Sequence, residues 1–252
     1  MYKFKIKRFI TLTILVFSAI QMNTADFKSN QKKYKRVKNA YKEKELLIKN
    51  LFKEKKLDYT NFEIIITAFK LEKDLIVYIK DKNNSKFTFF KKYEFCMLSG
   101  NLGPKRKEGD NQVPEGLYQI SNFNPQSNYH LSLKINYPNA SDKVLSDKKK
   151  PGGDIYIHGN CVSIGCIPIT DDLIEELYVL CVESKSKGYE IPVYIFPFKM
   201  TKTKFDYFNA CDYTNETKNL WENLQKAYTL FNSKKCKLNY SINSSGKYIY
   251  KE

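Results

Sequence analysis

Short runs of β-branched and aromatic residues, separated by turn-forming residues, fill the middle of this 252-residue chain and restrict its fold more than any other feature. Runs of this kind, bounded by Gly, Pro, Asn and Ser, predict strands. We expect strands at 62–69, 75–79, 87–97, 117–121, 130–135, 155–157 and 191–196. The intervening stretch 99–115 is rich in Gly and Pro and is expected to be a loop. The sequence therefore predicts an α+β fold that is mainly β, with flanking helices.

Helical periodicity appears in three places. Apolar residues recur at helical spacing over 171–186 and 219–231, and both segments are expected to be helices. Thr170, Asp171 and Asp172 are the cap candidates of the first of these helices, and for the two Asp residues capping is favoured over acid catalysis. From Phe27 to Lys56, twelve Lys or Arg residues accompany three Glu residues and an apolar stripe, which predicts a basic amphipathic helix. Its outer face is either a patch for an anionic wall or membrane or, the favoured interpretation, a solvated face of a helix that packs on the next domain.

The first 25 residues have the order of charged and apolar residues that is typical of an export signal. Four basic residues precede the uncharged run 9–20, which is shorter than the roughly 20 residues that span a bilayer. We interpret this segment as a signal peptide, with an uncleaved membrane anchor as the alternative. The protein is therefore expected in the periplasm or cell envelope. The net charge of +16 favours an acidic partner, and export argues against a nucleic acid.

The segment 154–172, which reads DIYIHGNCVSIGCIPITDD, contains the candidate catalytic residues. A predicted strand ends at His158, one of only two His residues in the chain, and a turn presents Cys166 eight residues later. A Cys and a His are the minimum set for acyl transfer by a thiolate, because the imidazole can take the thiol proton. Gly165 would let a carbonyl approach closely, and backbone N–H groups in such a turn can stabilise an oxyanion.

These motifs resemble the signature of a known family. I-H-G at 157–159 followed by S-x-G-C at 163–166 is similar to the signature of the L,D-transpeptidase catalytic domain, which is YkuD-like. The short interval between His and Cys resembles the YafK-like murein subgroup, as do the segments 102–110, 113–120 and 136–142. The resemblance covers roughly Phe62 to Phe198, and the helix that contains Trp221 belongs with it.

The resemblance implies an L,D-transpeptidase-type catalytic domain that acts on peptidoglycan stem peptides and needs no cofactor or metal. Cys166 would be the nucleophile that attacks the carbonyl of the L-centre of the third, diamino-acid residue, and His158 the general base. The carbonyl of Gly159 would orient the imidazole. Ser163, Gly165 and the backbone of Cys166 would line the oxyanion site. An amine that resolves the thioester gives a cross-link or an attached protein, and water gives cleavage, with roles in wall biogenesis and cell shape.

Two residues depart from the family pattern. Ile164 stands where many relatives have a second His, and Pro168 stands where many have Arg or Asn. Both changes argue against the ordinary cross-linking role. The subgroup is associated with release of wall-attached protein. The second candidate reaction is therefore hydrolysis of a diamino-acid to Lys linkage, with a wall-attached lipoprotein as partner. The alternative function is a noncatalytic peptidoglycan-binding module of the same fold.

The organisation expected from these patterns has five parts. They are a signal peptide at 1–25, a basic amphipathic helical segment at 26–58, the catalytic domain at 59–200, a C-terminal helical extension packed on it at 201–240, and a polar tail at 241–252.

Cys161 has three interpretations. The favoured one is a small packed residue beside the site. In an oxidising compartment it could instead form a disulfide with Cys166 and disable the thiol. The third is a zinc site of His158, Cys161 and Cys166, which would need His130 or Cys181 as a fourth ligand.

Aromatic and basic residues near the motif also have more than one interpretation. Tyr129, Tyr137 and Tyr156 could stack on sugar rings, but packing in the core is favoured because aromatic residues in strands are usually core or cross-strand partners. The loop 105–107, which reads KRK, either contacts a stem-peptide carboxylate or is solvated, and the sequence favours neither.

Overall fold

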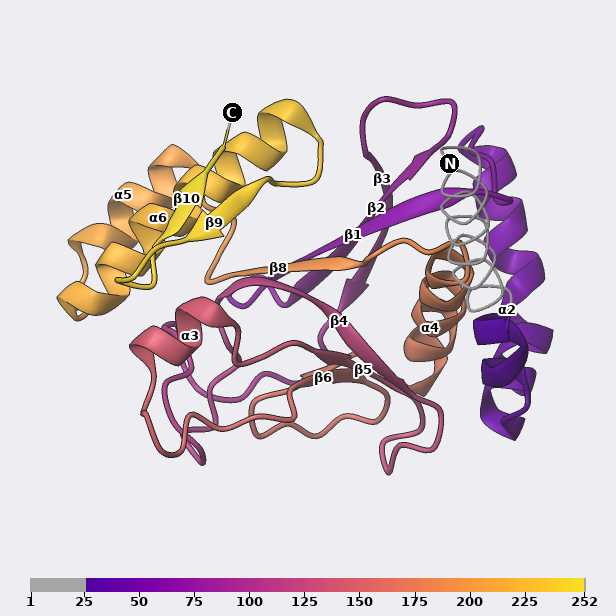
Figure 1. Ribbon diagram of the computed structural model, residues 1–252, viewed down its shortest axis with the longest axis horizontal. Helices are drawn as coiled ribbons and strands as arrows, with labels where there is room; N and C mark the ends of the chain where they lie inside the picture. Colours follow the sequence, from indigo (N-terminus) through magenta and orange to yellow (C-terminus); the bar gives the residue numbers. More distant parts are fainter. Residues whose placement is uncertain (1–25, 252) are drawn as a thin grey trace, which may run out of the picture.

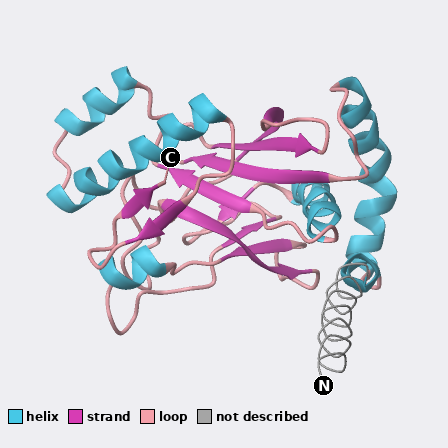
Figure 2. Ribbon diagram, turned by 45° about the horizontal axis from the view of Figure 1, so that its top comes forward, coloured by secondary structure: helices cyan, strands magenta, loops and turns pink. Residues whose placement is uncertain are grey.

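The computed structural model describes residues 26–251, in which helices flank an eight-stranded sheet (Figures 1 and 2). The predicted signal peptide lies outside the described residues. Among the residues described, no helix is both long and apolar enough to cross a membrane. The strands of the sheet are β1 (Phe62–Phe69), β2 (Asp74–Asp81), β3 (Thr88–Glu94), β4 (Gly116–Asn124), β5 (Ser132–Ile135), β6 (Tyr156–His158), β7 (Ile167–Pro168) and β8 (Pro192–Phe196).

The strand order is β3-β2-β1-β8-β4-β5-β6-β7. Neighbouring strands are antiparallel, except that β1 pairs with β8 and β6 pairs with β7 in parallel. The predicted strand 62–69 coincides with β1, and each of the other predicted strands overlaps an observed one. The two-residue strand β7 was not predicted, because so short a strand has no periodicity of its own.

Both faces of the central strands are buried. Along β1, Ile64 and Ile66 belong to one buried cluster, whereas Ile65 and Phe69 belong to a second cluster on the opposite face. Side chains alternate between the faces of a strand, so a strand with two buried faces is apolar throughout. This explains why the sequence shows continuous apolar runs at β1 and β8.

One face is covered by α2 (Lys35–Glu54) and α4 (Asp171–Lys185), which contact each other (Figure 1). Val37, Ile48 and Phe52 of α2 are almost completely buried in the first cluster. The basic helix is therefore packed on the sheet domain by its apolar stripe. Its lysines are exposed, except Lys44, whose side chain is 14% exposed and pairs with Asp172 of α4. Residues 26–32, which precede α2, are helical as well.

The opposite face is covered by the C-terminal part of the chain (Figure 2). The helices here are α5 (Lys202–Ala210) and α6 (Asn215–Lys234), and α3 (Ala140–Leu145) lies in the connection between β5 and β6. Trp221 of α6 is completely buried, and its indole N–H donates to Oε2 of Glu115 at 2.7 Å. Glu115 also forms an ion pair with Lys70 in the interior, at 2.9 Å.

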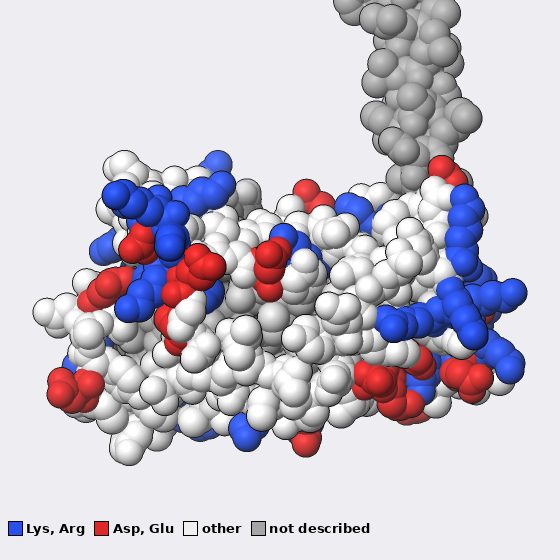
Figure 3. All heavy atoms as spheres, turned by 90° about the horizontal axis from the view of Figure 1, so that it is seen from below, with Lys and Arg blue, Asp and Glu red and all other residues white. Residues whose placement is uncertain are grey.

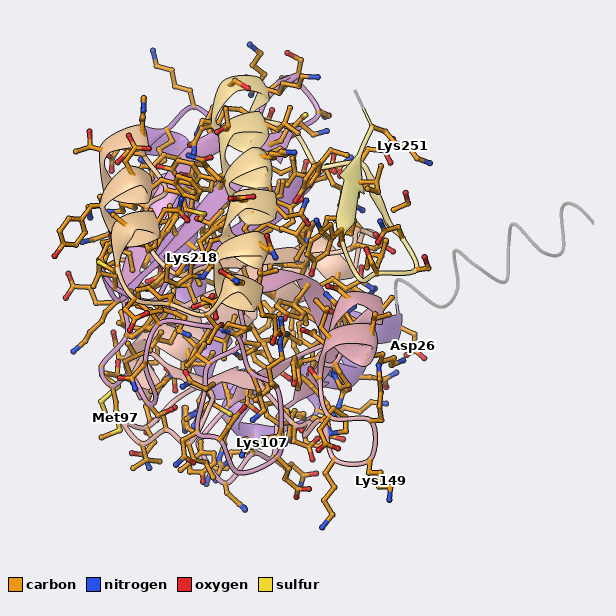
Figure 4. All side chains as sticks on the ribbon, turned by 90° about the vertical axis from the view of Figure 1, so that its left-hand side faces the viewer. Asp26, Met97, Lys107, Lys149, Lys218 and Lys251 are labelled. Carbon is orange, nitrogen blue, oxygen red and sulfur yellow. A yellow bond between two sulfur atoms is a disulfide. The ribbon has the colours of Figure 1, made fainter. Side chains whose placement is uncertain are left out.

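The predicted polar tail at 241–252 is wrong. Strands β9 (Tyr240–Ile242) and β10 (Tyr248–Tyr250) form an antiparallel hairpin beside α6, ending near Lys251 (Figure 4). The Tyr248 side chain is 2% exposed, and its hydroxyl accepts the N–H of Leu117 at 3.2 Å. The polar residues between the two strands form the turn of this hairpin. Because they dominate the segment, its composition did not indicate that Tyr248 is buried.

Candidate active site

The two candidate catalytic side chains lie at the ends of two paired strands. His158 is the last residue of β6, and Cys166 directly precedes β7. The parallel pairing of β6 with β7 brings Ile157 opposite Ile167. The loop between the strands therefore returns Cys166 to the edge of the strand that carries His158.

The environment of His158 fixes one tautomer of its imidazole. The ring nitrogen Nδ1 lies 2.5 Å from the carbonyl oxygen of Gly159, and a carbonyl can only accept a hydrogen bond. Nδ1 therefore carries the hydrogen in the neutral ring and leaves Nε2 as the basic atom. The side chain is 1% exposed, and burial lowers the pKa of His158 below the ordinary histidine value.

Cys166 is a free, partly buried thiol. Its Sγ accepts the N–H of Tyr156 at 3.4 Å and lies 3.7 Å from the carbonyl oxygen of Asp154. Burial raises the pKa of the Cys166 thiol above its ordinary value. This shift and that of His158 both favour the neutral forms, a thiol and an uncharged imidazole.

Ser163 stabilises the turn that leads to Cys166. Its hydroxyl donates to the carbonyl oxygen of Cys166 at 2.8 Å and accepts the N–H of Gly165 at 3.2 Å. Because the Gly165 N–H is already bonded within the turn, the Cys166 N–H is the better candidate for an oxyanion donor. Gly165 has φ +129°, where residues with a side chain are strained, and a Cβ there would lie 3.1 Å from the Gln112 carbonyl oxygen.

A cleft of about 420 Å³ opens over this pair. Its lining consists of Asn124, Ser127, Asn128, Tyr129, Ser132, Asp154, Tyr156, His158, Val162, Ser163, Ile164 and Cys166. The side chain of Ile164, which replaces the second His of many relatives, is 79% exposed at this cleft. The cleft therefore has an apolar group where those relatives have a titratable one.

The prediction that these tyrosines pack in the core is correct for Tyr137, which is 4% exposed, and wrong for Tyr129. Tyr129 is 42% exposed, and its ring centroid lies 4.7 Å from that of the His158 imidazole. Tyr156 is half-buried and lines the same cleft. Tyr129 lies in the turn before β5 rather than in a strand, so the strand-based argument for burial did not apply to it.

Cys161 is neither a free packed residue nor a partner of Cys166. It forms a disulfide with Cys96, which follows β3 in the chain. This bond removes Cys161 as a zinc ligand and leaves Cys166 free. It also links the loop that precedes β7 to the segment that follows β3, although β3 and β7 are the first and last strands in the order of the sheet. The spacing of cysteines in the sequence could not predict this pairing.

Of the three cap candidates, Thr170 is the N-cap residue of α4, whereas Asp171 and Asp172 are the first two residues of the helix, so the capping interpretation is wrong for these two. Asp171 accepts the N–H of Asn160 at 2.7 Å and so supports the loop after His158, and Asp172 pairs with Lys44 of α2.

The basic loop 105–107 is fixed by ion pairs within the protein. Lys105, which is 4% exposed, pairs with Asp110 at 2.6 Å. Arg106 pairs with Glu216 at 2.5 Å. These two side chains therefore hold the loop rather than standing in solvent.

One residue close to the site had no signal in the sequence. Arg36 of α2 donates from Nη1 to the carbonyl oxygens of Ser127 and His130, at 2.5 and 2.7 Å. These two residues flank Tyr129, so the N-terminal helix holds the turn that lines the cleft. Nothing in a run of basic residues distinguishes the one Arg that does this.

Gly159 leaves no room for a side chain. A Cβ would lie 2.5 Å from Oδ1 of Asp171 and 3.0 Å from the backbone oxygen of Tyr129. Gly159→Ala is expected to destabilise the fold by about 1–3 kcal/mol and to lower activity, since the backbone beside His158 must move. Thermal unfolding and turnover of Gly159→Ala and Gly153→Ala test this, because a Cβ at Gly153 meets nothing within 4 Å. Equal stability of the two variants would contradict it.

The comparison with known proteins identifies the family. The family model for the L,D-transpeptidase catalytic domain, YkuD, matches residues 65–195. The chain belongs to this family, and the predicted L,D-transpeptidase-type α+β fold is confirmed. The chain is 32% identical over 171 residues to YafK of Escherichia coli strain K12, which confirms the predicted resemblance to YafK. The match covers 67% of this chain and 66% of YafK, slightly less than two thirds of that protein.

Two solved structures are more distant. The helical cell shape determining protein Pgp2 of Campylobacter jejuni has 20% identity and a TM-score of 0.45, with 72% of this chain and 73% of that chain covered. Bd1075 of Bdellovibrio bacteriovorus has 20% identity and a TM-score of 0.38, with 68% and 57% covered.

Proposed function

We propose that this chain is an exported cysteine acyl-transfer enzyme that acts on peptidoglycan stem peptides through a thioester at Cys166. The observation that supports it most is the free Cys166 thiol lining the same cleft as an imidazole whose Nδ1 is held by Gly159. Membership of the L,D-transpeptidase family supports an enzyme that acts on peptidoglycan. The choice of bond and acceptor is part of the proposal.

The first half-reaction forms the thioester. Nε2 of His158 takes the proton of the Cys166 thiol while Sγ attacks the carbonyl of the L-centre of the diamino-acid residue. The Cys166 N–H stabilises the oxyanion that forms. The C–N bond then breaks, the leaving amine takes the proton from Nε2, and the acyl group remains on Sγ.

The second half-reaction decides the product. An amine that attacks the thioester gives a new amide, whereas water gives a carboxylate, and in both cases the thiol regains its proton through His158. The exposed Ile164 changes the groups available to an acceptor at the cleft, whereas Pro168 is buried in β7 and does not line the cleft. We therefore include release of protein from a diamino-acid linkage, such as a wall-attached lipoprotein, beside cross-linking.

Export to the periplasm or cell envelope is supported by two features. The disulfide between Cys96 and Cys161 belongs in an oxidising compartment. Membership of the L,D-transpeptidase family supports a place of action at the peptidoglycan wall. A role in wall biogenesis or cell shape follows for this chain as part of the proposal.

The pH profile tests the role of His158. The neutral imidazole is the active form, and burial lowers its pKa, so the acid limb of kcat/KM is expected to have its midpoint below the ordinary histidine pKa of about 6.5. His158→Gln is expected to lower kcat/KM by about 10³-fold and to move the acid limb to alkaline pH, where the thiol itself ionises. His130→Gln is the matched control, because the other His pairs with Glu175 and does not line the cleft. An unchanged acid limb in His158→Gln would contradict the assignment.

The experiment that identifies the reaction is mass spectrometry of the products. The chain from Asp26, which contains both buried clusters, is incubated under mild reduction with stem tetrapeptides and with sacculi that carry attached protein. Cross-linked peptides would define a transpeptidase, and released protein or trimmed peptides a hydrolase. Products must be absent with Cys166→Ser.

The noncatalytic binding module predicts a different result. Such a module would bind sacculi equally well as wild type and as Cys166→Ser, and it would give neither products nor a covalent adduct. That result would contradict the proposed enzyme and favour the noncatalytic peptidoglycan-binding module.

A further inference from the structure

The outward face of α2 carries a lysine stripe, defined here as Lys35, Lys38, Lys42, Lys49 and Lys53. Lys42, Lys49 and Lys53 lie 7, 14 and 18 residues after Lys35, which places these four on one face of a helix. All are exposed, and Lys and Arg side chains gather along this edge of the molecule (right-hand side of Figure 3). Within the described part of the chain, Lys35, Lys38 and Lys53 form no ion pair, whereas Lys42 and Lys49 pair with Glu43 and Glu45 of the same helix. Surface pairs of this kind are weak, so the stripe is a band of cations that an external anion can contact.

Apolar side chains stand exposed within and beside this stripe. Leu46 lies 11 residues after Lys35, on the same face of the helix, and is 69% exposed. Leu47 and Phe89 are each 52% exposed and line a shallow groove of about 370 Å³ between α2 and the edge strand β3. Lysines flank this groove too, since the Lys55 ammonium lies 5.4 Å from the centre of the Phe89 ring.

We propose that this face of α2, with Leu46, Leu47 and Phe89, docks on an anionic phospholipid bilayer. A helix that presents lysines together with exposed leucine and phenylalanine suits the bilayer interface, where the cations meet headgroup phosphates and the apolar groups enter the acyl boundary. A soluble wall polyanion offers the same charges but no apolar phase. The three apolar residues are what favour the bilayer over the wall polymer.

Docking through α2 would also set the position of the cleft. Arg36 is on the docked helix and donates to Ser127 and His130, on the turn that lines the cleft. Val37, Ile48 and Phe52 anchor the same helix in the core. The bilayer would therefore hold the whole domain, with the cleft at a fixed distance from the membrane surface.

Vesicle co-sedimentation of the chain from Asp26 tests this docking. Phosphatidylcholine vesicles are compared with vesicles in which about one third of the lipid is phosphatidylglycerol, at low and high salt. The triple variant Lys35→Gln, Lys42→Gln, Lys53→Gln is expected to bind the anionic vesicles about 100-fold more weakly. Its matched control replaces Lys202, Lys226 and Lys234, which are exposed on α5 and α6, and should bind as wild type does.

A second variant, Leu46→Gln with Leu47→Gln, separates a bilayer from a polymer. It is expected to bind anionic vesicles about tenfold more weakly, because two apolar groups no longer leave water. All replaced side chains are exposed, so the melting temperatures should not change. Equal vesicle binding of the triple variant and its control, or binding to sacculi that depends on the lysines but not on the leucines, would overturn the proposal. The second of these results would assign the stripe to a wall polyanion.

Discussion

Turnover of stem peptides is expected to fall by about 10⁴-fold or more when Cys166 is replaced by Ala, with no loss of folding. The thiol is the only group in the proposed mechanism that forms a bond to the substrate. Its Sγ receives one backbone N–H, from Tyr156 at 3.4 Å, so Ala removes little packing. Because burial raises the pKa of Cys166, the thiol is expected to alkylate slowly in free solution and to react only with a substrate placed beside His158.

Cys211→Ala is the matched control for this variant. Cys211 is also a free, half-buried thiol, but it lies at the end of α5 and does not line the cleft. Intact-mass spectra should show an acyl adduct on wild type and Cys211→Ala and none on Cys166→Ala. Full turnover by Cys166→Ala would remove Cys166 from the mechanism and leave the fold assignment unchanged.

Glu115→Ala is expected to destabilise the fold by about 3–5 kcal/mol, which corresponds to roughly 10 °C in the melting temperature. Both members of the Lys70 and Glu115 pair have side chains that are 0% exposed. The three N–H bonds of the ammonium group go to Glu115 and to the carbonyl oxygens of Gly103 and Val113. Loss of the carboxylate leaves a buried cation without its counter-charge and the Trp221 indole N–H without an acceptor.

Thermal unfolding of a control variant separates this effect from the loss of an ordinary ion pair. Glu190→Ala breaks the pair with Lys237, in which both side chains are about half exposed, and should change stability by less than about 1 kcal/mol. The double variant Lys70→Met, Glu115→Leu should recover part of the loss, because it removes the buried charge. Equal melting temperatures for Glu115→Ala and Glu190→Ala would contradict this account.

The sequence predicted the interior of the sheet better than its margins. Strands such as β1 are apolar on both faces, so a run of β-branched residues is enough to locate them. The hairpin of β9 and β10 has polar residues between single buried aromatics, such as Tyr248, and its strands are three residues long. It is stabilised by contacts with Leu117 and Asn223, which lie far away in the chain and give no local pattern.

The residues of the candidate site also differ in how far the sequence could predict them. His158, Cys166 and the turn between them lie in one short segment, so their relation could be predicted from spacing and from the family motif. Tyr129 and Arg36 reach the site from other elements, and only the tertiary fold places them there. Long-range contacts of this kind account for the wrong interpretations of Tyr129, Asp171 and Cys161.

The disulfide between Cys96 and Cys161 requires the folding chain to pair two particular thiols and to leave Cys166 free. Its two cysteines are 65 residues apart, and Cys166 lies much closer to Cys161 in the sequence. During oxidation the short loop closes more readily than the long one, so the first bond to form will often include Cys166, the proposed nucleophile. An active molecule then arises only after thiol–disulfide exchange returns Cys166 to the reduced state. The yield of active protein in the cell would then depend on its thiol-handling enzymes as well as on the stability of the fold.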